Sequence, residues 1–327
     1  MAKRIPFTQF AKDITKHHKG KTDFHRKEIR AFAAYKGVLV PAEVWENALG
    51  KNRYSMESAT NIRLSRPEIK YSEIENDTTV NEVFEDLSSL MHVISKKKLN
   101  SLIVTGNAGI GKTHTVIETL EKQGLVREKD YVVFRSKTSP LGLYLNLFLH
   151  HDKVIVFDDL DDLFTNDDCA SILKAALDSY DVREISWSSK KMQNVVGMDP
   201  AKRLALETEA RDQLMKGNPE VMLPNRFAFK GQIVFISNMS SDKFDKAVLS
   251  RSMNIDLTLS DSQVFSRMKN IVSKLVKTPA IAQKSMETII DKYNDGTLNH
   301  PNMRTVLNFA NVLQSGINNP ERLSKYC

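Results

Sequence analysis

Cysteine is scarce in this sequence, with only Cys169 and Cys327 among 327 residues. Two cysteines, one of them the last residue, do not make a disulfide framework, so we expect a reducing, cytoplasmic compartment. No run of about 18 apolar residues occurs, so no membrane-spanning helix is expected. The first ten residues, MAKRIPFTQF, lack the apolar segment of a secretory signal peptide.

An excess of positive charge is also missing from most of the chain. Residues 1–55 contain 12 Lys and Arg against 5 Asp and Glu, whereas the remaining residues carry 35 of each sign. The net charge of +7 therefore comes from the N-terminal block, which also holds His17, His18 and His25. A basic segment joined to a neutral one favours contact with a polyanion such as nucleic acid. A solvated N-terminal domain without such a partner is the alternative.

The length suits two or three domains. We expect a basic N-terminal domain over residues 1–55 and a polar linker without clear periodicity over residues 56–79. An α/β core should occupy residues 80–260. The β-type segments then stop, and residues 261–327 are expected to form a helical lid.

The N-terminal block has the pattern of a folded domain. FTQFAKDI and DFHRKEIRAFAAYKG place apolar residues at helical spacing, with Asp23 as the expected N-cap and Gly37 as the stop. VLVPAEVWENAL follows as a third helix, and GKNRYSM as a basic extended piece. This order is compatible with a winged helix-turn-helix, although small helical bundles of other kinds give the same pattern.

In the core, apolar strands alternate with helices after an amphipathic helix at residues 80–98. The expected strands are LIVTG, YVVFRS, KVIVFDD and QIVFISN, and the helices between them are THTVIETLEKQG, LGLYLNLFLHH and DCASILKAALDSY. Such alternation predicts an α/β fold in which helices cover both faces of a parallel sheet.

Residues 106–113, GNAGIGKT, match the phosphate-binding pattern G-x-x-x-x-G-K-[ST] between a strand and a helix. Glycines let successive backbone N–H groups turn toward phosphates. Lys112 is expected to reach the β- and γ-phosphates of ATP, and Thr113 to bind Mg²⁺. The expected nucleotide-binding residues are Gly106, Asn107, Ala108, Gly109, Ile110, Gly111, Lys112, Thr113 and His114.

A second apolar strand ends in two aspartates, as a site for Mg²⁺ and a nucleotide requires. Asp158 follows VIVF and should hold Mg²⁺, while Asp159 should orient and deprotonate the attacking water. A solvated acidic loop explains Asp161 and Asp162 well but explains the first two acids poorly, because they follow four apolar residues.

Over residues 80–318 the order of these motifs resembles the AAA+ family of ATPases. The resemblance implies that Asn238, after QIVFIS, is sensor 1 and that Arg304, in NHPNMRTVLNFANVL, is sensor 2. It further implies that Arg251, in LSRS, is an arginine finger that reaches a neighbouring subunit. The protein would then be a homo-oligomer, a ring or an open helical assembly, with a hexamer as one candidate.

Two further features qualify this resemblance. Asp159 stands where most members of the family carry Glu, which indicates slow or tightly gated hydrolysis. The sequence of residues 102–260 is similar to those of uncharacterised AAA+ ATPases of bacteriophages. This similarity implies that the protein acts in a bacterial or phage-infected cytoplasm.

The substrate of such a motor depends on two segments. REISWSSKKMQNVVG could be a hairpin that touches nucleic acid through Lys190 and Lys191, or an exposed lysine-rich loop. SKTSPLGLYLN could place Leu143 and Tyr144 in a substrate-gripping loop, although core positions are favoured. The longer stretch 184–230 interrupts the strand–helix alternation and is either functional or loosely ordered.

Three functions remain open at this point. The first is an ATPase that works on DNA as a helicase, helicase loader, or recombination or replication factor. The second is a protein remodeller, and the third is a nucleotide-gated structural oligomer with slow hydrolysis.

Overall fold

The computed structural model describes residues 7–18, 23–41, 44, 48–50, 53–55, 68–164, 166–189, 192–218, 220–298 and 300–326. The chain divides into two compact units. One contains Glu75–Leu275 and Asn302–Leu307, and is called the sheet unit here. The other contains Met1–Ile74, Val276–Pro301 and Asn308–Cys327. The helix at residues 261–275, which we expected in the lid, is thus part of the sheet unit.

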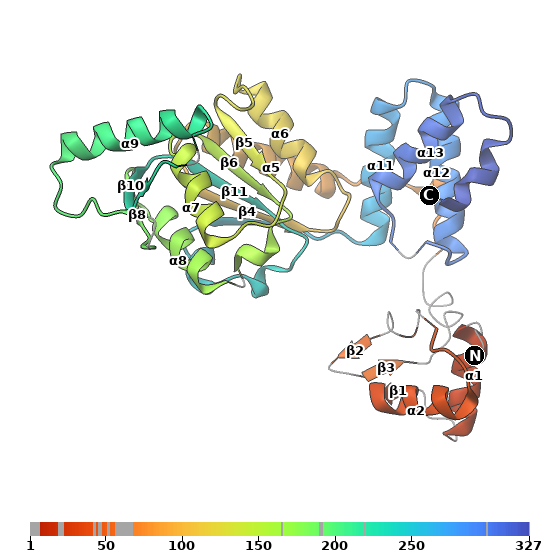
Figure 1. Cartoon of the computed structure of the whole chain (residues 1–327). Coiled ribbons are helices and arrows are strands. Elements are labelled where there is room, and N and C mark those ends of the chain that lie inside the picture. The colour runs from red at the N-terminus through yellow and green to blue at the C-terminus, as the bar shows by residue number, and fades with distance from the viewer. Residues whose placement is uncertain are drawn as a thin grey trace. The chain divides into compact units, whose positions relative to one another are not determined.

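The sheet unit is a mixed α/β structure built on a parallel sheet, as expected (Figure 1). The sheet contains the four strands expected from the sequence and a fifth, β12. Their order is β12-β4-β11-β6-β5, and each neighbouring pair is parallel. The strands are β4 (Ser101–Gly106), β5 (Tyr131–Phe134), β6 (Val154–Asp158), β11 (Gln232–Ile236) and β12 (Met253–Leu257). The whole of β4, β6 and β11 is buried, which explains their continuous apolar sequences.

Helices cover both faces of this sheet. Alternate strand residues such as Ile103, Ile155 and Phe235 join one core cluster with α7 (Pro140–Leu149) and α8 (Asp167–Ala176). The helices α5 (Thr78–Ser95) and α6 (Lys112–Lys122) pack against each other and contribute no residue to that cluster. They lie on the other face (Figure 1).

The long stretch 184–230 is folded in the part that the structure describes. The strand β7 (Arg183–Ser186) pairs antiparallel with β10 (Arg226–Phe229), and β8 (Met192–Gln193) pairs with β9 (Leu223–Pro224). The helix α9 (Pro200–Met215) lies between β8 and β9 in the chain. The first residues of the segment REISWSSKKMQNVVG form β7, but Lys190 and Lys191 lie outside the described residues.

Leu143 and Tyr144 belong to the core, as favoured, and do not form a gripping loop. Both are fully buried in α7. The Tyr144 hydroxyl donates a hydrogen bond to the Pro224 carbonyl at 2.8 Å, and burial raises the pKa of this phenol. The contact therefore ties α7 to the stretch 184–230.

Residues 262–318 are helical where described, as expected. They form α11 (Asp261–Leu275), α12 (Pro279–Asn294) and α13 (Met303–Gln314), and a 3-10 helix follows at Pro320–Tyr326. The end of the expected linker is structured, since a 3-10 helix spans Tyr71–Glu73 and α5 begins at Thr78. The amide of Asn294 exchanges two hydrogen bonds with the backbone of Ile69, at 3.0 and 2.7 Å. Residues 56–67 lie outside the described residues.

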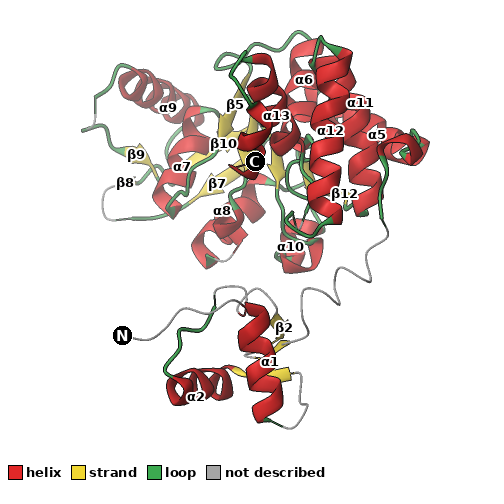
Figure 2. Ribbon diagram, turned by 90° about the vertical axis from the view of Figure 1, so that its right-hand side faces the viewer, coloured by secondary structure: helices red, strands yellow, loops and turns green. Residues whose placement is uncertain are grey.

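The N-terminal residues form α1 (Phe7–His17), β1 (Asp23–His25), α2 (Arg26–Lys36), β2 (Ala48–Gly50) and β3 (Arg53–Ser55) (Figure 2). The strands form an antiparallel sheet in the order β1-β3-β2. The core contains Phe10, Ile14, Phe24, Ile29 and Phe32. The third expected helix, VLVPAEVWENAL, is wrong at its two ends. Residues 38–41 are not helical, and Ala48–Gly50 forms β2, whereas Val44 is helical and buried.

One expected cap in this region is wrong. Asp23 lies in β1, and the N-cap of α2 is His25, whose Nδ1 accepts from the Lys27 backbone N–H while Glu28 accepts from the His25 N–H. This reciprocal capping box begins the helix two residues later than an Asp23 cap would. Gly37 ends the helix in the left-handed conformation with φ 64°, as expected. Within the described residues, no helix is both long and apolar enough to cross a bilayer.

Candidate phosphate-binding site

The loop between β4 and α6 has a backbone that only glycine adopts readily. Gly106, Gly109 and Gly111 have φ values of 130°, 72° and 99°. A Cβ atom on Gly106 would lie 2.5 Å from the backbone of Leu257, and one on Gly109 would lie 2.7 Å from the Cβ of Asn302. The glycine spacing seen in the sequence is therefore required both by conformation and by close packing.

Lys112 lies inside this loop and is only 5% exposed. Its Nζ donates to the carbonyl oxygens of Gly106 at 2.8 Å and Asn107 at 2.7 Å, and to Oδ1 of Asn238 at 2.8 Å. A buried ammonium group needs such acceptors to offset its lost hydration. The loop thus holds a compensated positive charge at the centre of the site.

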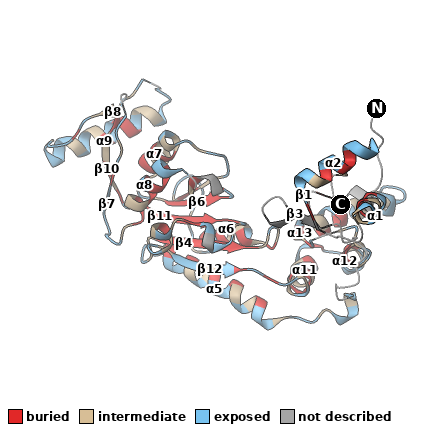
Figure 3. Cartoon of the chain, turned by 90° about the horizontal axis from the view of Figure 1, so that it is seen from below, coloured by how far each residue is buried: buried red, intermediate tan, exposed pale blue. Residues whose placement is uncertain are grey.

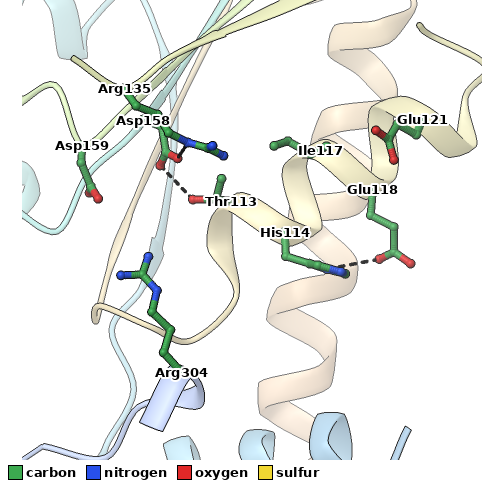
Figure 4. Close-up of a pocket in the computed structure, with 9 residues that line it drawn as sticks. All are labelled: Thr113, His114, Ile117, Glu118, Glu121, Arg135, Asp158, Asp159 and Arg304. Atoms are coloured by element: carbon green, nitrogen blue, oxygen red, sulfur yellow. Dashed lines mark hydrogen bonds and ion pairs between the residues drawn. The ribbon is translucent and has the colours of Figure 1, made fainter. Parts of the chain in front are cut away.

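Asp158 lies at the end of β6 and is also nearly buried, with 6% exposure. Its Oδ1 accepts from the Thr113 hydroxyl at 2.8 Å, and its Oδ2 accepts from Nε of Arg135 at 2.9 Å (Figure 4). A hydroxyl oxygen beside a carboxylate is the kind of ligand set that Mg²⁺ takes in phosphate sites. The described residues contain no cluster of three His, Cys, Asp or Glu side chains that could hold a metal ion.

Asp159 has a left-handed backbone, with φ 59°. Such a conformation is uncommon outside glycine, although Asp adopts it more readily than most residues. Its Oδ1 accepts from Nδ2 of Asn238 at 2.8 Å, while Oδ1 of Asn238 accepts from Lys112. One side-chain amide therefore bridges the buried lysine and the expected general base.

These groups line two adjoining cavities. The first has a volume of about 760 Å³ and is bordered by Thr113, Asp158, Asp159, Arg135 and Arg304 (Figure 4). The second has a volume of about 600 Å³, within the usual range for small-molecule sites. Besides the glycine-rich loop, its lining includes Ile271 and Leu275 of α11, and Met303, Arg304 and Leu307 of α13.

Arg304 comes from the first turn of α13, where the sequence placed it. Asn302 precedes this helix and its Oδ1 accepts from the Thr305 N–H at 3.0 Å, while the Met303 N–H donates to the Gly109 carbonyl at 2.9 Å. The helix start is therefore attached to the glycine-rich loop. In Figure 4 the guanidinium of Arg304 points toward the carboxylates of Asp158 and Asp159.

Arg251 is the predicted site residue that the fold does not bring to this cavity. It lies just before β12, at the end of the sheet where the parallel strands begin, called the amino edge here; the cavity lies where they end, the carboxyl edge. At the amino edge the Ser252 hydroxyl contacts the Ser101 hydroxyl at 2.7 Å. Because β4 extends from Ser101 to Gly106 at about 3.3 Å per residue, roughly 16 Å separates the two edges. Arg251 is exposed and donates from Nη1 to the Ala247 carbonyl at 3.0 Å.

The sequence reading missed two arginines. Arg135 follows the apolar strand YVVF at the same edge as Asp158, so its place after a strand was an available signal. Arg267 of α11 lines the second cavity, with its guanidinium 3.7 Å from the ring centroid of Phe84. Burial lowers the pKa of Arg267. No local pattern in the sequence indicated this second residue.

These features define a mixed α/β protein with a glycine-lined, cation-containing loop at the carboxyl edge of a parallel sheet. No protein-family model matches the chain. It is similar to an uncharacterized 36.7 kDa protein encoded in the nrdC-mobD intergenic region of Enterobacteria phage T4. The two are 25% identical over 274 residues, which cover 79% of this chain and 77% of the phage protein.

Proposed function

We propose that the protein is an oligomeric AAA+-type ATPase that couples binding and hydrolysis of Mg-ATP to work on DNA. One observation carries the nucleotide part of this proposal. The adjoining cavities beside the glycine-rich loop are lined by side chains from distant parts of the sequence: Lys112, Thr113, Asp158, Asp159, Asn238 and Arg304.

Each residue has a defined task in this proposal. The Lys112 ammonium exchanges its present acceptors for phosphate oxygens, and the loop N–H groups bind the same phosphates. Thr113 and Asp158 hold Mg²⁺, which supplies charge neutralisation on the phosphates when bound. Asp159 orients and deprotonates the attacking water, Asn238 holds that carboxylate in place, and Arg304 contacts the terminal phosphate.

The position of Arg251 supports the oligomeric part. An exposed arginine at the amino edge cannot reach the carboxyl-edge cavity of its own subunit, but it is available to a neighbour's cavity. An arginine supplied in trans stabilises charge on the phosphoryl group during transfer. We therefore expect a ring or an open helical assembly of identical subunits.

The basic N-terminal region supports the DNA part. The element order α1, β1, α2, β2, β3 and the sheet order β1-β3-β2 fit a winged helix-turn-helix, a fold often used on DNA. The excess of positive charge in residues 1–55 provides the electrostatic attraction that phosphates require.

The second candidate is a nucleotide-gated structural oligomer that hydrolyses ATP slowly. Asp159 favours it, because this carboxylate is one methylene shorter than Glu and is already hydrogen-bonded to Asn238. The third candidate is a protein-remodelling ATPase, in which the N-terminal region would be an adaptor.

ATP turnover measured with no DNA, with single-stranded DNA and with duplex DNA tests these alternatives. Stimulation by DNA supports the first function, and ATP binding with negligible turnover under all conditions supports the structural oligomer. Lys112→Ala should abolish nucleotide binding in every case, whereas Lys216→Ala, an exposed lysine paired with Asp212 on α9, should bind normally. Unchanged ATP affinity in Lys112→Ala would exclude the site.

A further inference from the structure

The ends of α1 and α2 expose an aromatic surface. Tyr35 is 71% exposed, and its ring centroid lies 5.2 Å from that of His17 at an interplanar angle of 38°. The His17 ring also packs 5.3 Å from the ring of Phe32, a residue of the buried core. His17 is therefore held by the core, and it supports a tyrosine ring that is largely open to solvent.

Cationic side chains lie beside this aromatic surface and along the same helix. Nζ of Lys36 lies 5.6 Å from the Tyr35 ring centroid, and Lys16, in the last turn of α1, is exposed. Lys27 and Arg30, nearer the start of α2, are exposed as well. Much of α2 is coloured as exposed in Figure 3. Lys27 and Tyr35 are eight residues apart, about 12 Å along the helix axis.

The carboxylates of the two helices are engaged in local contacts. Asp13 accepts a hydrogen bond from Nε2 of Gln9 at 2.8 Å. Glu28 accepts from the His25 N–H at 2.6 Å in the capping box. Between the cations and Tyr35, the exposed side of α2 carries Ala31 and Ala34, whose small side chains allow a close approach.

We propose that this surface, formed by His17, Lys27, Arg30, Tyr35 and Lys36, binds single-stranded nucleic acid by stacking an unpaired base on Tyr35. Aromatic rings interspersed with cations are what single strands require, because bases stack while the cations track the phosphates. In a duplex both faces of each base are covered by its neighbours, so the exposed ring has no free base to contact. The inference rests on the proposed action on DNA and names the form of nucleic acid.

Fluorescence anisotropy of the full-length protein tests it, with a labelled oligothymidylate and a blunt duplex of the same length as probes. Tyr35→Ala should weaken binding of the single strand by about 5- to 100-fold, the range for loss of one stacked base, and leave duplex affinity unchanged. Tyr35→Trp should retain single-strand affinity. Tyr180→Ala is the matched control, since Tyr180 is 70% exposed but belongs to the sheet unit.

The salt dependence separates stacking from charge. Tyr35→Ala should keep the slope of log affinity against log salt concentration, whereas Lys27→Ala with Arg30→Ala should reduce the single-strand slope by about 0.7 for each phosphate that the protein no longer neutralises. Equal weakening of both probes by Tyr35→Ala, or no weakening of either, would overturn the stacking proposal while leaving action on DNA intact. Absence of nucleic-acid binding by the unaltered protein would overturn both, whereas the ATPase assignment would still be judged by Lys112→Ala.

Discussion

The two edges of the central sheet differ in how their charged groups are paired. At the carboxyl edge, Lys112 and Asp158 are nearly buried and are hydrogen-bonded to neighbouring groups of the same site. At the amino edge, Arg251 is exposed, with a hydrogen bond to a carbonyl of its own helix. The end of the strands at which a charged residue lies therefore decides whether its side chain can reach the cavity of its own chain.

The largest expected effect comes from removing the Arg251 side chain at the amino edge. Arg251→Ala should bind ATP nearly normally but lose turnover by about 10³- to 10⁵-fold, because the transferring phosphoryl group lacks its stabilising cation. Steady-state turnover and a fluorescent nucleotide-binding assay measure the two quantities separately.

Mixed samples show whether the loss arises between subunits. Adding Lys112→Ala to Arg251→Ala should restore part of the activity, because the lysine variant still offers its own Arg251 to an intact cavity. Arg304→Ala should not be restored in this way, because Arg304 lines the cavity of its own subunit. Turnover per subunit that is independent of protein concentration, with no restoration on mixing, would contradict a role in trans.

Asp159→Asn should lower turnover by about 10²- to 10⁴-fold and keep ATP affinity, because the amide cannot accept the proton of water. The variant should also accumulate as an ATP-bound oligomer, visible by size-exclusion chromatography with and without ATP. Asp161→Asn, in the same acidic run, is the matched control and should hydrolyse normally. Normal hydrolysis by Asp159→Asn would place the base elsewhere.

Arg183 is a second arginine at the amino edge and, unlike Arg251, it is buried. Arg183 donates from Nη2 to the Gly231 carbonyl, and its Nε and Nη1 have no hydrogen-bond partner among the described residues. Burial lowers the pKa of Arg183 to about 10. Arg183→Met should leave the free energy of unfolding within about 1 kcal/mol of the original, since an apolar chain of similar length avoids the desolvation of the cation.

Arg183→Ala separates volume from charge at the same position. It should lower the free energy of unfolding by about 2–4 kcal/mol, because the space of a long side chain is left unfilled. Urea denaturation measures both variants. Equal, large destabilisation by both substitutions would show that the guanidinium itself holds this edge together.

The smallest effect concerns Arg135, which pairs with Asp158 although its own side chain is 55% exposed. If Asp158 holds Mg²⁺ as proposed, this guanidinium would compete with the ion for the carboxylate. Arg135→Ala should then lower the Mg²⁺ concentration for half-maximal turnover by about 1.5- to 5-fold, as for an exposed ion pair. Arg127→Ala, which removes an exposed pair with Glu128, should not change it. A higher Mg²⁺ requirement in Arg135→Ala would mean that the arginine assists the metal site.

The proximity of the candidate site residues was easier to predict from the sequence than the structure around them. Asp158 ends one apolar strand, Asn238 follows another, and Thr113 lies in the first turn of the helix after a third. Parallel strands bring their carboxyl ends to one edge, so the proximity of these residues could be expected. The pairing of β7 with β10 could not, because it joins residues about forty positions apart with no local signal of register. The three-residue strand β1 was likewise too short to show periodicity, and it displaced the expected cap at Asp23.

The opposite placement of the cavity and Arg251 has a consequence for how many sites an assembly can complete. A surface that offers one group and receives another is heterologous, so it cannot close as a two-fold dimer and leads instead to a ring or a filament. Every site in a ring has a neighbour's arginine, whereas an open filament leaves one end subunit without it. Turnover per subunit would then rise with the number of subunits in the filament and would be highest in a closed ring. Turnover per subunit would thus distinguish a short open filament from a closed ring.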